Sequence, residues 1–285
     1  MQSIHMAAGN IQMDAGEAFI CAGIESMSRV PMSGFNPLLH PGLAERFPQA
    51  YISMGETAEN VAQKHQIPRA RQEEFAVASH QKAAAAQAAG KLKDEIVAIQ
   101  ANGASVELDG CIRPDTSAAA LADLKPAFST DGSVTAGTAS PLTDGASAVL
   151  VTSEDYAKAH GLKPLARLRS IAVAGCDPEI MGIGPVAASR KALERAGIAA
   201  GDLDIIELNE AFASQALACA DELGLDLAKV NLDGGAIALG HPLGATGARI
   251  TGKAAQLLQR EGKQLALSTQ CIGGGQGIAT VLEAA

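Results

Sequence analysis

Apolar positions follow two different periods at the start of the chain. Between residues 1 and 13, Ile4, Ala7 and Ile11 recur at helical spacing, whereas residues 17–24 are almost all apolar. Helical spacing predicts an amphipathic helix, and a short apolar run favours a buried strand. We therefore expect a helix followed by one strand of a sheet.

The next hundred or so residues differ in composition. Proline and glycine are frequent at first, and a long alanine-rich run then follows Pro68 and ends at Gly90, a residue type that commonly terminates helices. The elements expected here are a loop at 29–49, a helix beginning after Ser53, a helix over 69–89, a strand over 96–99 and an irregular stretch with a brief helix over 111–125. We interpret this helical, loop-rich block as an inserted domain.

Strand and helix patterns alternate through the second half of the chain. The expected elements are strands at 145–152, 165–174, 203–208, 265–270 and 277–282, a capped helix start at Ser153, and helices at 184–196, 211–223 and 247–260. Such alternation is typical of layered α/β domains. The fold class predicted from the pattern is α/β.

Composition narrows the function classes. The chain has 285 residues, 47% of them hydrophobic and only 3% aromatic, which predicts two domains or one domain with a large insertion. A net charge of −9 argues against a nucleic-acid partner.

The five cysteines are far apart, odd in number and without a C-x-x-C pair. This pattern predicts a reduced, cytoplasmic protein without disulfides. No apolar run reaches the length of a membrane span, and the N-terminus lacks the features of a signal peptide, so we expect no membrane insertion.

Candidate chemistry gathers around one glycine-rich stretch. Residues 231–249 hold His241 among five glycines, Cys271 directly precedes Ile272 and three glycines, and Asn209 follows an apolar run. An imidazole can accept a proton, and a thiol beside free backbone N–H groups suits proton transfer or an oxyanion hole. These three residues are the predicted catalytic set.

Each of these residues also has a structural explanation that the sequence leaves open. His241 could be a structural histidine, Cys271 an inert core residue, and Asn209 a helix cap.

Two nucleotide motifs and a metal site are disfavoured. Residues 182–187 fit a dinucleotide fingerprint, but no clear strand directly precedes them, and residues 234–247 lack the Gly-Lys-Ser/Thr ending of a P-loop. The other histidines show no metal-ligand spacing, so no metal is expected.

At these motifs the sequence closely resembles the thiolase family. The resemblance rests on Asn209-Glu-Ala-Phe, on Gly235-Ala-Ile-Ala-Leu-Gly-His-Pro-Leu-Gly-Ala-Thr-Gly and on Cys271-Ile-Gly-Gly-Gly, in that order. It continues upstream through Met54-Gly-Glu-Thr-Ala-Glu and Val134-Thr-Ala-Gly and covers essentially the whole chain.

The resemblance implies a thiolase-like layered α/β/α fold with two similar halves, each a mixed five-stranded sheet between helices. The implied segments are a remnant of the N-terminal half at 1–28, an inserted coenzyme A-binding loop domain at 29–139, the last strand of the N-terminal half with a linker at 140–158, and the C-terminal half at 159–285.

The implied reaction is acyl transfer between coenzyme A thioesters, by thiolytic cleavage of a 3-ketoacyl-CoA or by the reverse Claisen condensation. By resemblance, His241 assists a nucleophilic cysteine and forms one oxyanion hole with a water on Asn209. Cys271 moves the proton at the substrate α-carbon, and the Gly273 N–H contributes to a second oxyanion hole.

Coenzyme A or acyl-CoA is expected as substrate, with no tightly bound cofactor. The resemblance puts Arg113 near the nucleotide end and the following residues along the pantetheine: Met54, Phe128, Ala136, Ser140 and Phe212. It also implies a homodimer or homotetramer, and the residues around Ser140 favour the longer-chain members of fatty acid β-oxidation.

The sequence departs from the family at the nucleophile. The family's Cys-x-Ser-Gly motif immediately precedes the helix matched by residues 1–13, and none of the five cysteines has that context. We therefore expect a chain truncated in its N-terminal half and inactive or impaired. The alternative is a non-catalytic coenzyme A-binding or scaffold remnant.

Overall fold

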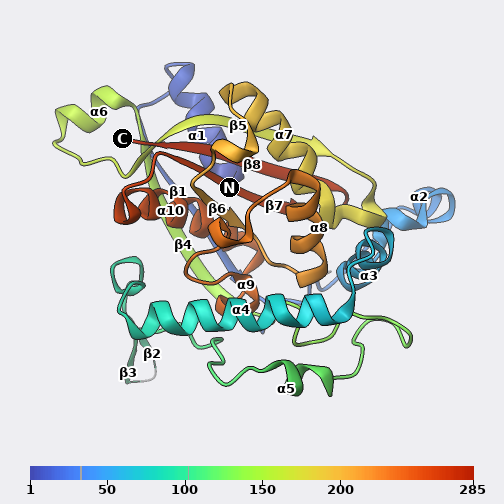
Figure 1. Cartoon of the computed structure of the whole chain (residues 1–285). Helices are drawn as coiled ribbons and strands as arrows, with labels where there is room; N and C mark the ends of the chain where they lie inside the picture. Colours follow the sequence, from blue (N-terminus) through green and yellow to red (C-terminus); the bar gives the residue numbers. More distant parts are fainter. Residues whose placement is uncertain (33, 102) are drawn as a thin grey trace.

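The computed structural model describes residues 1–32, 34–101 and 103–285. Two β-sheets and their helices form the body of the molecule, and the long helix α4 runs along one side of it (Figure 1). The helices are α1 (Gln2–Gln12), α2 (Pro41–Arg46), α3 (Met54–Lys64), α4 (Arg69–Ala88), α5 (Ala118–Ala122), α6 (Glu154–Ala159), α7 (Gly184–Ala196), α8 (Ala213–Leu223), α9 (Ala236–Leu239) and α10 (Leu243–Glu261). The strands are β1 (Ala18–Ser26), β2 (Ile99–Ala101), β3 (Ala104–Val106), β4 (Asp144–Thr152), β5 (Ala166–Gly175), β6 (Ile205–Leu208), β7 (Leu265–Ile272) and β8 (Gln276–Ala284).

The sheet of the C-terminal half has the order β5-β8-β7-β6. Strands β6 and β7 are parallel and the other pairs antiparallel. Apolar side chains of α7 and α8 pack on one face, and those of α10 on the other, where Ala254 and Leu257 meet Ile205 and Ala266. Because β6 and β7 are parallel, their carboxyl ends lie at the same edge of the sheet.

A second, two-stranded sheet pairs β1 with β4 in antiparallel register, from Ala18 opposite Thr152 to Ser26 opposite Asp144. Helix α1 covers one face through Ile4 and Ala7, which pack with Cys21. Helix α10 also contacts β1 and β4, so it lies between the two sheets.

The chain between β1 and β4 carries α2 to α5 and the β2–β3 hairpin. Helix α3 starts with a capping box between Ser53 and Glu56. The Arg69 guanidinium at the start of α4 donates to the carbonyls of Leu121 in α5 and of Leu124 just after it, which ties the two helices together. Helix α4 contacts α8 and α9 of the C-terminal half. This segment therefore lies against the body near the ends of the central strands.

Most predicted elements are confirmed, and the helix over 184–196 has the predicted bounds. The strand predicted over 96–99 is wrong: Lys93–Glu95 forms a 3₁₀ turn, and β2 begins only at Ile99. The loop predicted over 29–49 contains helix α2, and its residue 33 lies outside the described residues.

The expected five-stranded sheet is also corrected. Within the described residues the C-terminal sheet has four strands, and Val230 adds only an isolated bridge to Ile206. Among the residues that the structure describes, no helix is both long enough and apolar enough to cross a bilayer.

Candidate functional site

Asn209 and Cys271 lie where two neighbouring parallel strands end. The backbone N–H of Asn209 donates to the carbonyl of Thr269 at 3.0 Å, which extends the pairing of β6 with β7 by one residue. Cys271 lies two residues further along β7. Asn209 is 1% exposed and Cys271 8% exposed, so both side chains are buried at this end of the sheet.

A tight turn places His241 beside this strand edge. Gly240 has φ of +92°, and a Cβ there would lie 2.5 Å from the Thr143 methyl group. The His241 backbone N–H donates to the Thr143 hydroxyl at 3.2 Å. Only glycine fits this turn, which explains part of the glycine content of the stretch.

The segments on both sides of this turn are more helical than the sequence pattern predicts. The short helix α9 precedes it, and α10 begins at Leu243 rather than at Gly247. His241 therefore sits directly before the helix that lies between the two sheets.

Both ring nitrogens of His241 have partners. Nε2 lies 3.3 Å from Asn209 Nδ2, and Nδ1 lies 2.7 Å from Thr246 Oγ1. Burial lowers the pKa of His241 to about 4, and the positive charge of Arg249 acts in the same direction. The imidazole is therefore neutral at neutral pH, the form that can accept a proton.

Cys271 packs in an apolar cluster that includes Met54 and Phe212. Burial raises the pKa of its thiol to about 12, and Cys176 contributes to the rise. At neutral pH the sulfur keeps its proton, so Cys271 is poised to donate a proton rather than to attack as a thiolate.

Gly273 lies in the exposed turn after β7. A Cβ at this position would lie 3.3 Å from the Met54 Cε, and the two following glycines have φ of +86° and +94°. The turn thus places its backbone beside the first residue of α3.

Several residues predicted to line the pantetheine lie together. The rings of Phe128 and Phe212 meet edge to face with centroids 5.7 Å apart. The Ser140 backbone N–H donates to the Ala211 carbonyl at 2.9 Å, and Met54 joins the Cys271 cluster. Side-chain contacts therefore connect Cys271 with Phe128 through Phe212.

Ala136 and Arg113 are less closely placed. Ala136 is exposed in the turn in which the Thr138 N–H donates to the Thr135 carbonyl at 3.1 Å. Arg113 is exposed, and its backbone N–H donates to His80 Nδ1 at 3.1 Å. No hydrogen bond within the described residues joins Arg113 to the other predicted site residues.

Glu210 is a structural feature that the sequence reasoning missed. It is 2% exposed, and it accepts hydrogen bonds from Ser79 Oγ at 2.6 Å, Asn231 Nδ2 at 2.7 Å and the Ile237 N–H at 3.2 Å. A Cβ on Gly235 would lie 2.0 Å from its carboxyl carbon. These bonds hold the loop of Asn209 against α4 and α9. The sequence signal for Glu210 was a charged residue inside an apolar stretch.

Thr143, Thr246 and Glu207 were missed as well. The two threonines fix the backbone and the ring of His241. Glu207 is 2% exposed, and its Oε1 makes no hydrogen bond within the described residues. Burial raises the pKa of Glu207 to about 8, against the opposing charge of Arg249.

Burial raises the pKa of each of the other four cysteine thiols too: Cys21, Cys111, Cys176 and Cys219. At Cys111 the side chain of Thr143 opposes this rise. None of the four has the low pKa that an activated nucleophile requires.

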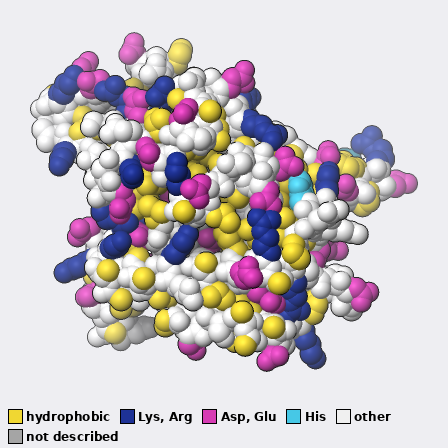
Figure 2. All heavy atoms as spheres, viewed as in Figure 1, with side chains coloured by type: hydrophobic (Ala, Val, Ile, Leu, Met, Phe, Trp, Pro, Cys, Tyr) yellow, Lys and Arg dark blue, Asp and Glu magenta, His cyan; other side chains and the backbone are white. Residues whose placement is uncertain are grey.

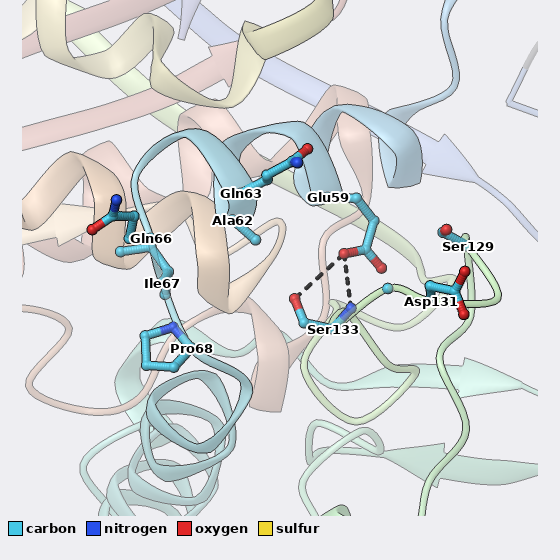
Figure 3. A pocket seen from close by; sticks show the side chains of 10 residues that line it. Glu59, Ala62, Gln63, Gln66, Ile67, Pro68, Ser129, Asp131 and Ser133 are labelled. Carbon is cyan, nitrogen blue, oxygen red and sulfur yellow. Dashed lines mark hydrogen bonds between the residues drawn. The ribbon is translucent and has the colours of Figure 1, made fainter.

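Two cavities lie away from these residues. One of about 520 Å³ is bounded by α3, by residues 66–68 between α3 and α4, and by residues 129–133 (Figure 3). Glu59 on its wall accepts hydrogen bonds from the Ser133 and Val134 N–H groups at 2.9 and 3.0 Å, so its carboxylate ties α3 to that loop. A larger one of about 1060 Å³ lies between α1, β4, β5 and α10.

The face shown in Figure 2 carries acidic and basic side chains intermixed rather than gathered into a single charged patch. Within the described residues, no three His, Cys, Asp or Glu side chains are grouped as ligands for a metal ion.

Known proteins are similar to this chain in sequence and fold. The chain matches the family models described as the thiolase N-terminal domain over residues 1–155 and the thiolase C-terminal domain over residues 162–284. It is 54% identical over 295 residues to a 3-ketoacyl-CoA thiolase of Shewanella loihica, in an alignment covering 100% of this chain and 76% of that protein. It is 51% identical to a 3-ketoacyl-CoA thiolase of Aeromonas salmonicida, covering 99% of this chain and 75% of that protein.

A crystal structure of human mitochondrial 3-ketoacyl-CoA thiolase in complex with CoA matches with a TM-score of 0.91 and 42% identity, covering 100% of this chain and 75% of that one. Because the N-terminal family model matches residues 1–155, these comparisons give no support to the predicted truncation, which stays a prediction. The roles of the predicted site residues stay predictions as well. The matches to both thiolase domains show that the chain belongs to the thiolase family.

Proposed function

We propose that the chain acts in acyl transfer between coenzyme A thioesters, in the cleavage of a 3-ketoacyl-CoA or the reverse condensation. The observation that carries the proposal is the hydrogen-bonded pair of Asn209 and His241 at the strand edge that also presents Cys271. Negative charge develops on the thioester oxygen in both directions, and donors fixed at that point lower the barrier.

Cys271 supplies a proton in the cleavage direction. Breaking the carbon–carbon bond of a 3-ketoacyl thioester leaves an enolate, whose α-carbon takes a proton. A thiol with a pKa raised to about 12 carries that proton at neutral pH.

The neutral His241 accepts a proton from an attacking thiol, and it then donates to the developing oxyanion. Asn209 holds a water for the same oxygen, and the Gly273 N–H serves a second oxyanion. Coenzyme A extends from Cys271 along the surface of Met54, Phe212 and the other predicted pantetheine residues, with its nucleotide end at Arg113.

The acylation of a nucleophilic cysteine is the step for which these 285 residues offer no suitable thiol. No cysteine lies in a Cys-x-Ser-Gly motif, and burial raises the pKa of all five thiols. We therefore propose that the 285-residue polypeptide performs α-proton transfer but little or no thiolysis. The same observation favours the second candidate function, a coenzyme A-binding scaffold without chemistry.

We also propose the segment division expected from the resemblance. It consists of residues 1–28 from the N-terminal half, 29–139 as the coenzyme A-binding insertion, 140–158 as strand and linker, and 159–285 as the C-terminal half. A cytoplasmic location, supported by the scattered cysteines, and a homodimer or homotetramer complete the proposal.

Two assays test the proposal. In the first, acetyl-CoA is incubated in D₂O, and deuterium in its methyl group is followed by mass spectrometry. Exchange that depends on Cys271 supports the proposal, and coenzyme A binding without exchange supports the scaffold. In the second, loss of the acetoacetyl-CoA enolate absorbance is followed with added CoA, with human mitochondrial 3-ketoacyl-CoA thiolase as the reference. Thiolysis at the reference rate contradicts the proposed defect in the covalent step.

A further inference from the structure

Two consecutive residues of α4, Ser79 and His80, connect this helix to different parts of the molecule. Both are buried, and Figure 1 shows α4 between the body of the molecule and the segment of α5. Ser79 Oγ donates to Glu210 at 2.6 Å, in the loop that follows Asn209. His80 Nδ1 accepts a hydrogen bond from the backbone N–H of Arg113 at 3.1 Å. Helix α4 therefore supports both the strand ends and the residue proposed for the nucleotide end of coenzyme A.

The hydrogen bond to Arg113 determines the protonation of the His80 ring. A backbone N–H can only donate, so Nδ1 is the acceptor and carries no proton. The single proton of the neutral ring is then on Nε2. In a protonated ring both nitrogens are donors, and an Nδ1–H cannot accept from the Arg113 N–H. The bond to Arg113 therefore exists only while His80 is neutral.

This bond attaches an exposed segment to the rest of the molecule. Among the residues that the structure describes, no other hydrogen bond joins the backbone of residues 107–116 to another segment. The side chains of Arg113 and Asp115 are exposed. Loss of the His80 bond therefore frees the backbone that carries the Arg113 guanidinium.

The same segment supplies the charges that act on His80. Burial lowers the pKa of His80 from its ordinary value of 6.5, the positive charge of Arg113 lowers it further, and the negative charge of Asp115 opposes both. Cys111 keeps its proton at neutral pH, because burial raises the pKa of its thiol. Protonation of His80 therefore places a second positive charge beside Arg113.

The other ionisable groups around α4 have partners of their own. Helices α5 and α9 contain only alanine, leucine and isoleucine. On α8, Asp221 and Glu222 are each paired with an arginine. Lys82 on α4 donates to a backbone carbonyl at 2.8 Å, and the Glu210 carboxyl accepts the hydrogen bonds described above. The charges acting on the ring therefore come from the attached segment.

We propose that His80 is a positioning residue for the coenzyme A surface, whose neutral ring holds the Arg113 segment in place and whose protonation releases it. The proposal rests on the proposed function, because it takes Arg113 as a contact of the nucleotide end. The pKa of His80 is lowered while the bond exists. The attached segment is therefore favoured above the ordinary histidine pKa of 6.5 and is lost progressively as pH falls below it.

The first test follows the Arg113 amide in ligand-free protein labelled with ¹⁵N-arginine. Its ¹H–¹⁵N signal, identified by its loss in Arg113→Lys, is expected to move as pH falls from about 7.5 to about 4.5. In His80→Asn a side-chain oxygen replaces Nδ1 as the acceptor and cannot be protonated, so the signal should stay in place. A signal that does not move in the unmodified chain, or that moves equally in His80→Asn, overturns the proposal.

His40→Asn is the matched control. The Nδ1 of His40 also accepts a backbone N–H, that of Leu43 at 3.2 Å, but His40 is exposed at the start of α2. The Arg113 signal of this variant should move with pH as in the unmodified chain. A signal that stays in place in His40→Asn assigns the titration to another histidine and contradicts the role of His80.

The second test measures the affinity for coenzyme A by calorimetry. His80→Leu removes the acceptor and should weaken binding at pH 7.5 by about 2- to 10-fold, because the contribution of one exposed cation limits the loss. His80→Asn should restore the affinity. From about pH 7.5 to about pH 5, the unmodified chain should lose affinity by a similar factor beyond any loss in His80→Asn, since the phosphates of coenzyme A titrate alike with both proteins.

A double variant separates this role from a general disturbance of α4. In the Arg113→Ala chain, His80→Leu should have little further effect on affinity, because the two changes act on the same contact. An equal loss in both backgrounds overturns the proposal. If the chain binds no coenzyme A, the proposed function fails, while the Arg113 amide still decides whether His80 holds this segment. If His80→Leu does not fold, the comparison of the unmodified chain with His80→Asn decides it.

Discussion

Two regions of the proposed site are built in different ways. At the carboxyl ends of β6 and β7, Asn209 and Cys271 are buried, and His241 beside them is hydrogen-bonded through both ring nitrogens. Burial lowers the pKa of His241 to about 4 and raises that of Cys271 to about 12. On the surface proposed for coenzyme A, Phe128 is 41% exposed, and Ala136 and Arg113 are exposed too. The side chains proposed for catalysis are held by the fold itself, whereas the surface proposed for coenzyme A is open to solvent.

The contrast explains why substitutions in the two regions should differ in size. A buried group loses a hydrogen bond with no water to replace it, and such a loss is costly. An exposed cation interacts across high-dielectric solvent, and its contribution is small.

The largest effect is expected at the strand ends. Cys271→Ser and His241→Asn should each lower the rate of deuterium exchange into acetyl-CoA by about 10² to 10⁴-fold, because each removes a group that moves or stabilises charge at the reacting carbon. The rate is measured by mass spectrometry, with Cys219→Ser as the matched control for a buried thiol outside the site. An exchange rate that is unchanged in either variant contradicts the larger effect expected at the buried strand ends.

The next effect is on stability. Gly240→Ala introduces a methyl group at φ of +92°, 2.5 Å from Thr143, and should destabilise the fold by about 1–3 kcal/mol. Gly201→Ala is the control, because nothing lies within 4 Å of its added methyl group. Urea denaturation measures both. Equal unfolding midpoints for the two variants contradict the strained turn before His241.

The third effect depends on pH. The pKa of Glu207 is raised from 4.5 to about 8, so the folded chain binds the extra proton, and that stabilising contribution is lost as pH rises through 8. Glu207→Gln cannot ionise, so its folding stability does not fall over this pH range. The variant should be more stable than the unmodified chain at pH 9 by on the order of a few kcal/mol, with a much smaller difference at pH 4.

Denaturation at several pH values measures this difference. Glu194→Gln, at an exposed site on α7, is the control. A Glu207→Gln stability difference that does not change with pH contradicts the buried carboxyl.

The smallest effect is expected at Arg113. Arg113→Ala should weaken the binding of coenzyme A by less than about 10-fold, because an exposed charge pair contributes about 1 kcal/mol or less. Isothermal titration calorimetry measures the affinity, and Lys163→Ala serves as the control for an exposed cation. A loss of 100-fold or more shows that the ligand surface is as tightly built as the strand ends.

The sequence predicts the buried region better than the exposed one, for physical reasons. Helices such as α7 and strands such as β6 follow from apolar periodicity, and the glycine turn predicts a close approach at His241. The failure over 96–99 lies at the start of an exposed hairpin, where no core face fixes the pattern. Thr246 and Glu210 were missed because their contacts join distant positions that periodicity does not reveal.

The most direct test of the central claim is a crystal structure of the chain with acetyl-CoA bound. The account predicts the thioester oxygen within hydrogen-bonding distance of His241 Nε2, the methyl carbon beside Cys271 Sγ and the pantetheine along Met54 and Phe212. Acetyl-CoA bound elsewhere, for example in the cavity beside Glu59, with His241 and Cys271 untouched, would contradict it.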